Sequence, residues 1–450
     1  MRRLSIDHLL KKCPVIPLFL LYIGVQTGLL FVINVPFTSD SLHYYQLAAD
    51  CVKHHSLYPA SHNLFDEYIL APLFINYLIC LLKWWHDPEM IHVANLLLNS
   101  LLALLTYFIV RRVTRNGVSA KIALILYMAY LNTLGAIFLN LTEFIFSLLI
   151  LTTLFLVIYK KTGIFFIAGI IAACAFNVRP VGIVLPISIS IAIWLQKLGN
   201  KKKLMMNALL LSGFTIAAGV FGLISKMTFG HFITNSTNGS VNILIGANEH
   251  ATGTFNSDVF LPGNRGYIPN EEALPYYEKN QIWRTRAIGW IRNHPGRWLM
   301  LIPVKLLVLY LWDDWALHPL LNSNQWNLYS VMKTTLKDKK ENRFLKESSA
   351  GFIIRFIMLY ITHYCYYFII LFFGLRSGIR IFRTGIQKSG FLQQIITMFI
   401  LGASGMVMMV YGAARYKYPM MLLLIILIPV CMSKPVIPDE DALLLPESSR

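Results

Sequence analysis

One carboxylate near the start of the chain has the residue type and the position to do chemistry at a membrane surface. Asp40 lies in NVPFTSDSLHYYQLAAD, directly after an apolar run from Val15 to Val35. Such an acid can be a solvated loop residue or a helix cap. It can also accept or orient the proton of an attacking hydroxyl or amine. His43 and Tyr44, just beyond it, are further site candidates.

The same segment holds a second acidic point, Asp66 and Glu67 in NLFDEYILAP. Two separated acids beside an apolar wall could divide the binding and the activation of a hydroxyl or amine. They could also hold a divalent ion through oxygen ligands, so a metal is possible but not specified. We interpret the histidines of this segment as interface residues without a metal-ligand context: His43, His54, His55 and His62.

Charged residues at the ends of later apolar runs could meet an anionic group. Arg179 in FNVRPVG lies in a tight apolar turn, where it needs an anion or must reach lipid headgroups. Arg415 and Lys417 in ARYKYP repeat this situation, and Lys305 is a weaker candidate for the same phosphate-binding role. A guanidinium suits a phosphate. Glu143 in NLTEFIF is either a helix cap or a site candidate that needs partners or water.

The elements that must position these residues are membrane helices. Apolar residues make up 56% of the 450 and charged residues only 14%, against about 25% in soluble proteins. Mean hydropathy is +0.57, and several runs approach the roughly 20 residues that cross a bilayer as a helix. We therefore expect an all-α, polytopic membrane protein with about 10–11 transmembrane helices, outer-face surface helices and membrane lipids as neighbours.

The net charge of +18 comes from short basic clusters between the apolar runs, such as RRVTR and QKLGNKKK. Such clusters are typical of cytoplasmic loops and anionic headgroups, so no nucleic-acid partner is expected. The basic N-terminus indicates an uncleaved first helix that starts in the cytoplasm. The six cysteines are scattered and form neither a disulfide frame nor a metal knuckle.

Alternating sidedness divides the chain into modules. We expect a transmembrane module over 1–227 that includes a first outer loop at 36–89, an outer loop with an amphipathic surface helix at 228–298, a C-terminal transmembrane module at 299–433 and a flexible tail at 434–450. The short run 299–312 is not expected to cross. The predicted membrane helices after the first lie at about 90–110, 122–140, 143–159, 163–178, 181–195, 205–226, 352–375, 391–411 and 418–433.

In order and sidedness these motifs resemble the GT-C class of membrane glycosyltransferases, in the branch of protein O-mannosyltransferases and aminoarabinose transferases. The resemblance rests on SDSLHYYQLA, FDEYILAPLFINYLICLLKWW, LTEFIF, NVRPVG, NILIGANEHATGTFN with Asn248, and the terminal RYKYP. It covers nearly the whole chain. It departs from the family at the first-loop motif, where two acids often stand side by side and Asp40 is flanked by serines.

The resemblance implies a polyprenyl-phosphate sugar donor and a lipid, glycan or protein acceptor on the non-cytoplasmic face, with transfer by inverting displacement. The family's first-loop aspartate matches Asp40, and Asp66 and Glu67 are candidates for the second acid. A bacterial inner membrane, with the site on its periplasmic face, fits this expectation. The alternatives are a transporter or lipid-glycan flippase, a glycan polymerase or ligase that uses diphosphate-linked donors, and a non-catalytic scaffold.

Overall fold

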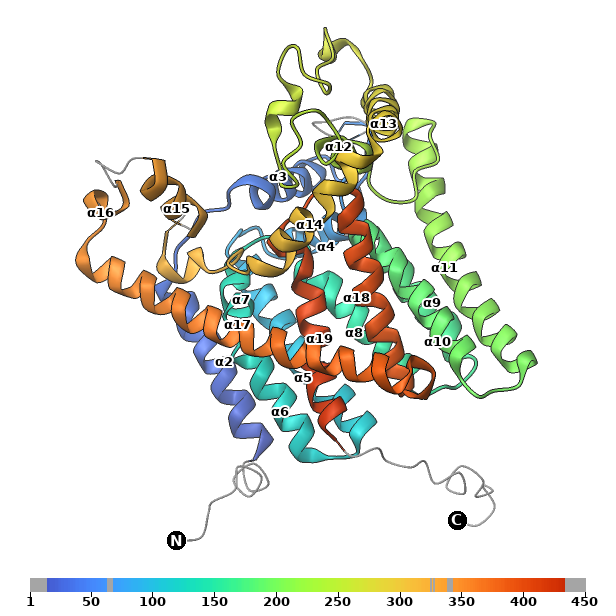
Figure 1. Ribbon diagram of the computed structural model, residues 1–450. Coiled ribbons are helices and arrows are strands. Elements are labelled where there is room, and N and C mark those ends of the chain that lie inside the picture. The colour runs from blue at the N-terminus through green and yellow to red at the C-terminus, as the bar shows by residue number, and fades with distance from the viewer. Residues whose placement is uncertain (1–13, 63–67, 324–325, 327, 338–342, 434–450) are drawn as a thin grey trace, which may run out of the picture.

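Long apolar helices form the body of the molecule. The computed structural model describes residues 14–62, 68–323, 326, 328–337 and 343–433 (Figure 1). Within them, six helices are long and apolar enough to cross a membrane, with mean hydropathies of 1.5 to 2.1. They are α2 (Val15–Val32), α5 (Met90–Thr114), α11 (Asn200–Phe229), α17 (Ala350–Thr384), α18 (Phe391–Met409) and the stretch Ala414–Met432 that contains α19 (Tyr418–Met432). The predicted all-α polytopic membrane architecture is confirmed.

A further apolar helical stretch is bent sharply in the middle. Helix α6 (Gly117–Met128) and the stretch Leu131–Phe138, made of α7 (Leu131–Gly135) and η1 (Ala136–Phe138), meet at an angle of 58°. The bend arises because Tyr130 has extended backbone angles, φ −79° and ψ 97°. This break falls inside the helix that the sequence predicted as continuous over 122–140.

Three predicted membrane helices are short. They are α8 (Glu143–Val157), α9 (Ile164–Val178) and α10 (Val184–Leu195), the last preceded by the 3₁₀ turn η2 (Pro180–Ile183). At about 1.5 Å per residue they reach roughly 18–22 Å, less than the ~30 Å hydrocarbon core. Length and composition therefore give six spans among the described residues, or seven with the bent pair, fewer than the 10–11 expected.

Five helices gather at one end of the bundle, which we call the loop end (Figure 1). They are α3 (Ser39–Lys53), α4 (Pro72–Trp84), α12 (Gly239–Ile245), α13 (Tyr276–Asn293) and α14 (Pro295–Leu311). Helix α14 occupies the short run expected not to cross, and it is not among the candidate spans. Apart from the helices, the described residues contain one isolated bridge between Thr254 and Gly412.

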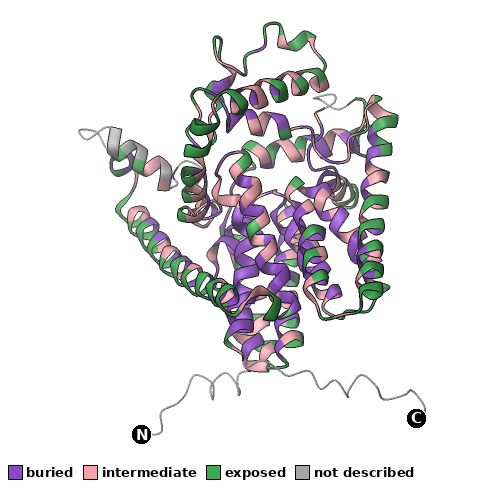
Figure 2. Cartoon of the chain, turned by 45° about the vertical axis from the view of Figure 1, so that its right-hand side comes forward, coloured by how far each residue is buried: buried purple, intermediate pink, exposed green. Residues whose placement is uncertain are grey.

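Burial separates a packed interior from an apolar exterior (Figure 2). Every residue from Tyr418 to Cys431 in α19 is buried, so this helix forms the centre of the bundle. Large apolar side chains on the outer helices are exposed, including Phe31 at 85% and Met227 at 87%. Such surface is unfavourable in water and suits contact with lipid. The segment that precedes α19 is therefore held at the loop end by a rigid central element.

Candidate active site

The first site contact joins the segment after the first membrane helix to the turn that precedes the last one. Asp40 lies in the first turn of α3, where a helix N-terminus favours a negative charge. Arg415 lies in the 3₁₀ turn η7 (Ala414–Lys417). Its Nη2 is 2.5 Å from Oδ2 of Asp40, and the two side chains are 31% and 46% exposed. The start of α3 is itself anchored, because Asn140 donates a hydrogen bond to the carbonyl of Ser41 at 3.0 Å.

A second ion pair is buried beside the first. Glu143 begins α8 and Arg179 ends α9, and Nη1 of Arg179 donates to Oε1 of Glu143 at 2.8 Å. The side chains are only 3% and 12% exposed, respectively. The anionic partner that a membrane arginine requires is therefore a carboxylate of the protein itself. Both residues were site candidates from the sequence, which did not predict that they contact each other.

Two tyrosines connect the ion pairs into one cluster. The guanidinium of Arg179 lies 5.4 Å from the ring centre of Tyr416, the residue after Arg415. Burial raises the pKa of Tyr44 far above its ordinary value, and the charges of Arg415 and Asp40 act on it next, followed by those of Glu143 and Arg179. The charges of four groups, on α3, α8 and η7 and directly after α9, thus act on one phenol at the loop end.

Lys305 lies on α14 beside Gly412, in the segment that leads to Arg415, and is engaged differently. Its side chain is fully buried, and Nζ donates to the carbonyls of Gly246 at 3.1 Å and Met408 at 3.0 Å. Among the described residues, no carboxylate forms an ion pair with Lys305. Burial lowers the pKa of Lys305 to about 8. An anion that reached Nζ would be bound by a group that already carries the cost of desolvation.

Backbone segments pack so closely around Lys305 that two positions, Gly246 and Gly412, have no room for a side chain. A Cβ on Gly246 would lie 1.9 Å from the carbonyl oxygen of Val410. A Cβ on Gly412 would lie 2.5 Å from the carbonyl oxygen of Lys305 itself. Gly412 also donates its N–H to the carbonyl of Gly253 at 2.8 Å. These contacts hold the segment that leads to Arg415 against α14.

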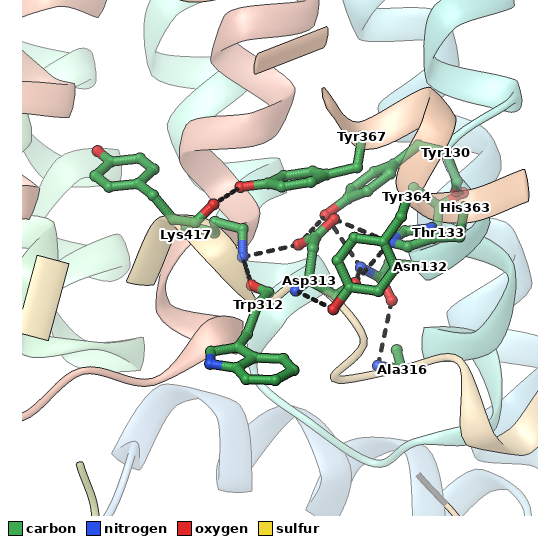
Figure 3. Close-up of polar contacts among 11 residues, drawn as sticks. Tyr130, Asn132, Thr133, Trp312, Asp313, Ala316, His363, Tyr364, Tyr367 and Lys417 are labelled. Atoms are coloured by element: carbon green, nitrogen blue, oxygen red, sulfur yellow. Dashed lines mark hydrogen bonds and ion pairs between the residues drawn. The ribbon is translucent and has the colours of Figure 1, made fainter. Parts of the chain in front are cut away.

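Lys417 belongs to a different environment from Arg415, although only Tyr416 separates them. Its Nζ lies 3.0 Å from Oδ1 of Asp313 and also donates to the carbonyl of Trp312 (Figure 3). Nε2 of His363 is 3.1 Å from the other carboxylate oxygen, and all three charged or titratable side chains are fully buried. Lys417 thus lies in a closed polar network rather than on the surface that Arg415 shares with Asp40.

The rest of this network comes from the broken helix. Tyr130 donates its hydroxyl to Oδ1 of Asp313 at 3.0 Å, and Asn132 donates to the carbonyl of Asp313 at 2.7 Å (Figure 3). The network therefore ties the bend between α6 and α7 to the segment after α14, to α17 and to η7. It consists of buried groups that satisfy one another inside the fold. Sequence reasoning missed Asp313 and His363; the only signal was a pair of acids after a short apolar run.

The remaining site candidates are not part of the Asp40 and Glu143 ion pairs. Asn248 is buried, donates to the carbonyls of Leu244 and Ile245, and accepts from the N–H of His250, which makes it a turn residue. Burial lowers the pKa of His43, and the charge of Asp40 opposes this. Asp66 and Glu67 lie outside the described residues.

A basic cavity lies at the opposite end of the bundle. It has a volume of about 570 Å³. Its cationic lining residues come from the ends of α5 and α17 and from the loops after α8 and α17: Arg112, Arg115, Lys160, Arg380 and Lys388. These basic residues and the Asp40 cluster therefore lie at opposite ends of the bundle. None of the predicted site residues lines this cavity.

Comparisons with protein-family models, curated proteins and solved structures find no match for this chain. The chemistry of the site therefore has to be argued from its own groups. A partly exposed carboxylate bound to an exchangeable guanidinium, next to a fixed ion pair and an aromatic wall, can receive an anionic ligand and take up a proton.

Proposed function

We propose that the protein is a membrane glycosyltransferase that moves a sugar from a polyprenyl-phosphate donor to a hydroxyl or amine of a lipid, glycan or protein acceptor. The observation that carries this proposal is the contact of Asp40 with Arg415 at the loop end of the bundle. The carboxylate of Asp40 and the guanidinium of Arg415 come from distant parts of the chain. We expect a lipid-tethered sugar to lie where they meet, at the end of the bundle opposite the basic cavity. The resemblance to GT-C enzymes supports the same role for Asp40.

The exposed pair suggests how the donor would be received. Arg415 can exchange the carboxylate of Asp40 for the phosphate of the donor, since both are oxyanions that accept bidentate hydrogen bonds from a guanidinium. This exchange releases Asp40 from its counter-ion and so makes it a better proton acceptor. The guanidinium of Arg179 stays bound to Glu143 and is not released to the donor. Lys305, on α14 beside the segment that leads to Arg415, offers a second cation.

The reaction is then a single displacement. The oxygen or nitrogen of the acceptor forms a bond to the anomeric carbon as the bond from that carbon to the phosphate oxygen breaks. The electron pair leaves with the lipid phosphate, whose charge Arg415 stabilises. The proton of the acceptor passes to Asp40. The configuration at the anomeric carbon is inverted, and no nucleotide is consumed.

The direct test is release of lipid phosphate by the purified protein. Full-length protein in detergent would be incubated with undecaprenyl-phosphate sugars and simple hydroxyl or amine acceptors. Asp40→Asn should lower turnover at least about 100-fold, the usual contribution of a general base. Asp258→Asn, an exposed acid elsewhere in the outer loops, serves as the matched control and should leave turnover unchanged. Normal turnover by Asp40→Asn would exclude the assigned role.

A transporter or flippase for lipid-linked anions is the second candidate. The observation that favours it is the fully buried network of Asp313, His363 and Lys417 beside the broken helix, because buried charges and interrupted helices also occur in transporters. Reconstituted vesicles separate the two functions. A transporter moves the intact donor across the bilayer, whereas the proposed enzyme releases lipid phosphate from it.

A further inference from the structure

A second cluster of chemically capable side chains lies at the other end of α3. Nδ1 of His54 is 3.3 Å from Oδ1 of Asp50, and Nε2 of His62 is 3.9 Å from Oδ2 of the same carboxylate. The two imidazole rings lie 4.3 Å apart. One ligand atom from each of the three residues lies within 4.8 Å of the others.

The local chain explains how these residues meet. Asp50 and His54 are four residues apart at the end of a helix, which places both side chains on one face. The chain then turns back, with the N–H of Ser56 donating to the carbonyl of Cys51 at 2.9 Å. The hydroxyl of Ser56 lies 3.2 Å from Nε2 of His62, so the turn brings this nitrogen to the end of α3, and a bound ion would take the place of that contact. The returning loop thus brings a second imidazole to the carboxylate.

The donor set and spacing suit a divalent transition metal. Two imidazole nitrogens and a carboxylate oxygen are ordinary zinc ligands, and zinc bonds of about 2.0–2.2 Å place neighbouring tetrahedral ligands roughly 3.3 Å apart. The separation of Asp50 and His54 already has this value, and that of Asp50 and His62 exceeds it by a fraction of an ångström. A helix cap explains His54, whose Nδ1 is also 3.0 Å from the carbonyl of Asp50. A helix cap does not explain why the ring of His62 also lies beside the carboxylate of Asp50.

The cluster is also accessible. The side chains of His54, His62 and Asp50 are 45%, 29% and 16% exposed, so an ion can enter from solvent and a water can complete a four-coordinate site. We propose that Asp50, His54 and His62 bind one Zn²⁺-like ion. The sequence-based interpretation of these histidines as interface residues did not consider this grouping, because the loop that returns His62 to Asp50 was not predicted.

The site is distinct from the Asp40 cluster. Asp40 and Asp50 lie ten residues apart in α3, which is about 15 Å along a helix. A bound ion would fasten the loop of residues 54–62 to the helix that carries Asp40. The proposal does not depend on glycosyl transfer, because metal binding is measured directly.

Metal analysis of the full-length protein tests this site. After removal of any affinity tag and treatment with a chelator, the protein would be titrated with Zn²⁺ and, separately, with Co²⁺, whose visible absorption reports its coordination geometry. One ion per chain is expected. His62→Ala and Asp50→Asn should weaken binding by about 100-fold or more, beyond the 10–100-fold typical of outer-shell changes. His55→Ala, the adjacent exposed histidine, is the matched control and should bind as the unaltered protein does.

A second variant covers the case in which the alanine change disturbs the loop. His62→Cys keeps a zinc ligand at the same position and should retain Zn²⁺, with a Co²⁺ spectrum that gains a thiolate charge-transfer band. Failure of the unaltered protein to retain Zn²⁺, or equal loss of binding in His55→Ala and His62→Ala, would overturn the proposal.

Discussion

The carboxylate of Asp40 and the guanidinium of Arg415 lie 2.5 Å apart while both remain partly open to solvent. The neighbouring pair of Glu143 and Arg179 has similar chemistry but is almost completely buried. Because of this difference in burial, we expect Arg415 to bind a ligand and Arg179 to stabilise the fold. An exposed pair can exchange one partner for a ligand at small cost, whereas a buried pair loses several kcal/mol when one partner is removed.

Arg415→Gln is expected to weaken binding of polyprenyl phosphate about 10–100-fold, because a hydrogen bond to a charged group contributes about 1.5–3 kcal/mol. The thermal midpoint should change little, since an exposed ion pair contributes at most about 1 kcal/mol. Binding can be measured by native mass spectrometry in detergent, and stability by thermal unfolding of the same samples. Arg284→Gln, which changes an exposed cation of α13, is the control. Unchanged lipid-phosphate affinity in Arg415→Gln would remove it from the donor site.

Glu143→Gln is expected to destabilise the fold by about 3–5 kcal/mol, because it leaves the guanidinium of Arg179 buried without its counter-charge. The double variant Glu143→Gln with Arg179→Gln should lose less than the sum of the two single changes, since it removes both charges together. Thermal and denaturant unfolding of the four proteins measures this coupling. Strict additivity would show that the two side chains do not support each other.

The sequence predicted the elements well and the contacts between them poorly. Hydropathy located the membrane helices because a lipid environment leaves few alternatives to a long apolar helix. Charge types at helix ends also identified Asp40, Arg179 and Arg415 as groups that need partners. Which carboxylate meets which arginine depends on packing between distant helices, and no local pattern encodes it. Lys417 shows the limit, because a shift of two positions along the same 3₁₀ turn directs its side chain to the buried Asp313, whereas Arg415 stays partly exposed.

Lys417→Met is expected to cost about 3–5 kcal/mol of stability by leaving Asp313 buried without its cation. It should leave the intrinsic affinity for lipid phosphate unchanged in the folded fraction, because Lys417 has no exposed surface. A second change, Asp313→Leu, should recover part of the lost stability by removing the orphaned charge. Lipid-phosphate binding and thermal unfolding, measured side by side with Arg415→Gln, separate the two roles. A selective loss of phosphate binding in Lys417→Met would contradict the buried placement.

Lys305 gives the fold a predicted pH dependence. Burial lowers its pKa in the folded protein to about 8, against 10.5 in an unfolded chain. Between these values the unfolded state binds the extra proton, so stability rises as the pH is raised from about 8 to about 10.5. Below pH 8 both states are protonated and the full penalty is present. The difference of about 2.5 pKa units corresponds to about 3 kcal/mol.

The measurement is the difference in unfolding free energy between the unaltered protein and Lys305→Met over pH 7 to 10. Methionine keeps the volume of the chain but carries no proton, so it cancels the titration of every other group in the comparison. The unaltered protein should gain stability relative to Lys305→Met as the pH rises through 8. Added lipid phosphate should reduce that gain, because an anion at Nζ would favour the charged amine in the folded state. A difference that stays flat across this range would show that Lys305 remains charged without a cost, supported by the carbonyls of Gly246 and Met408 alone.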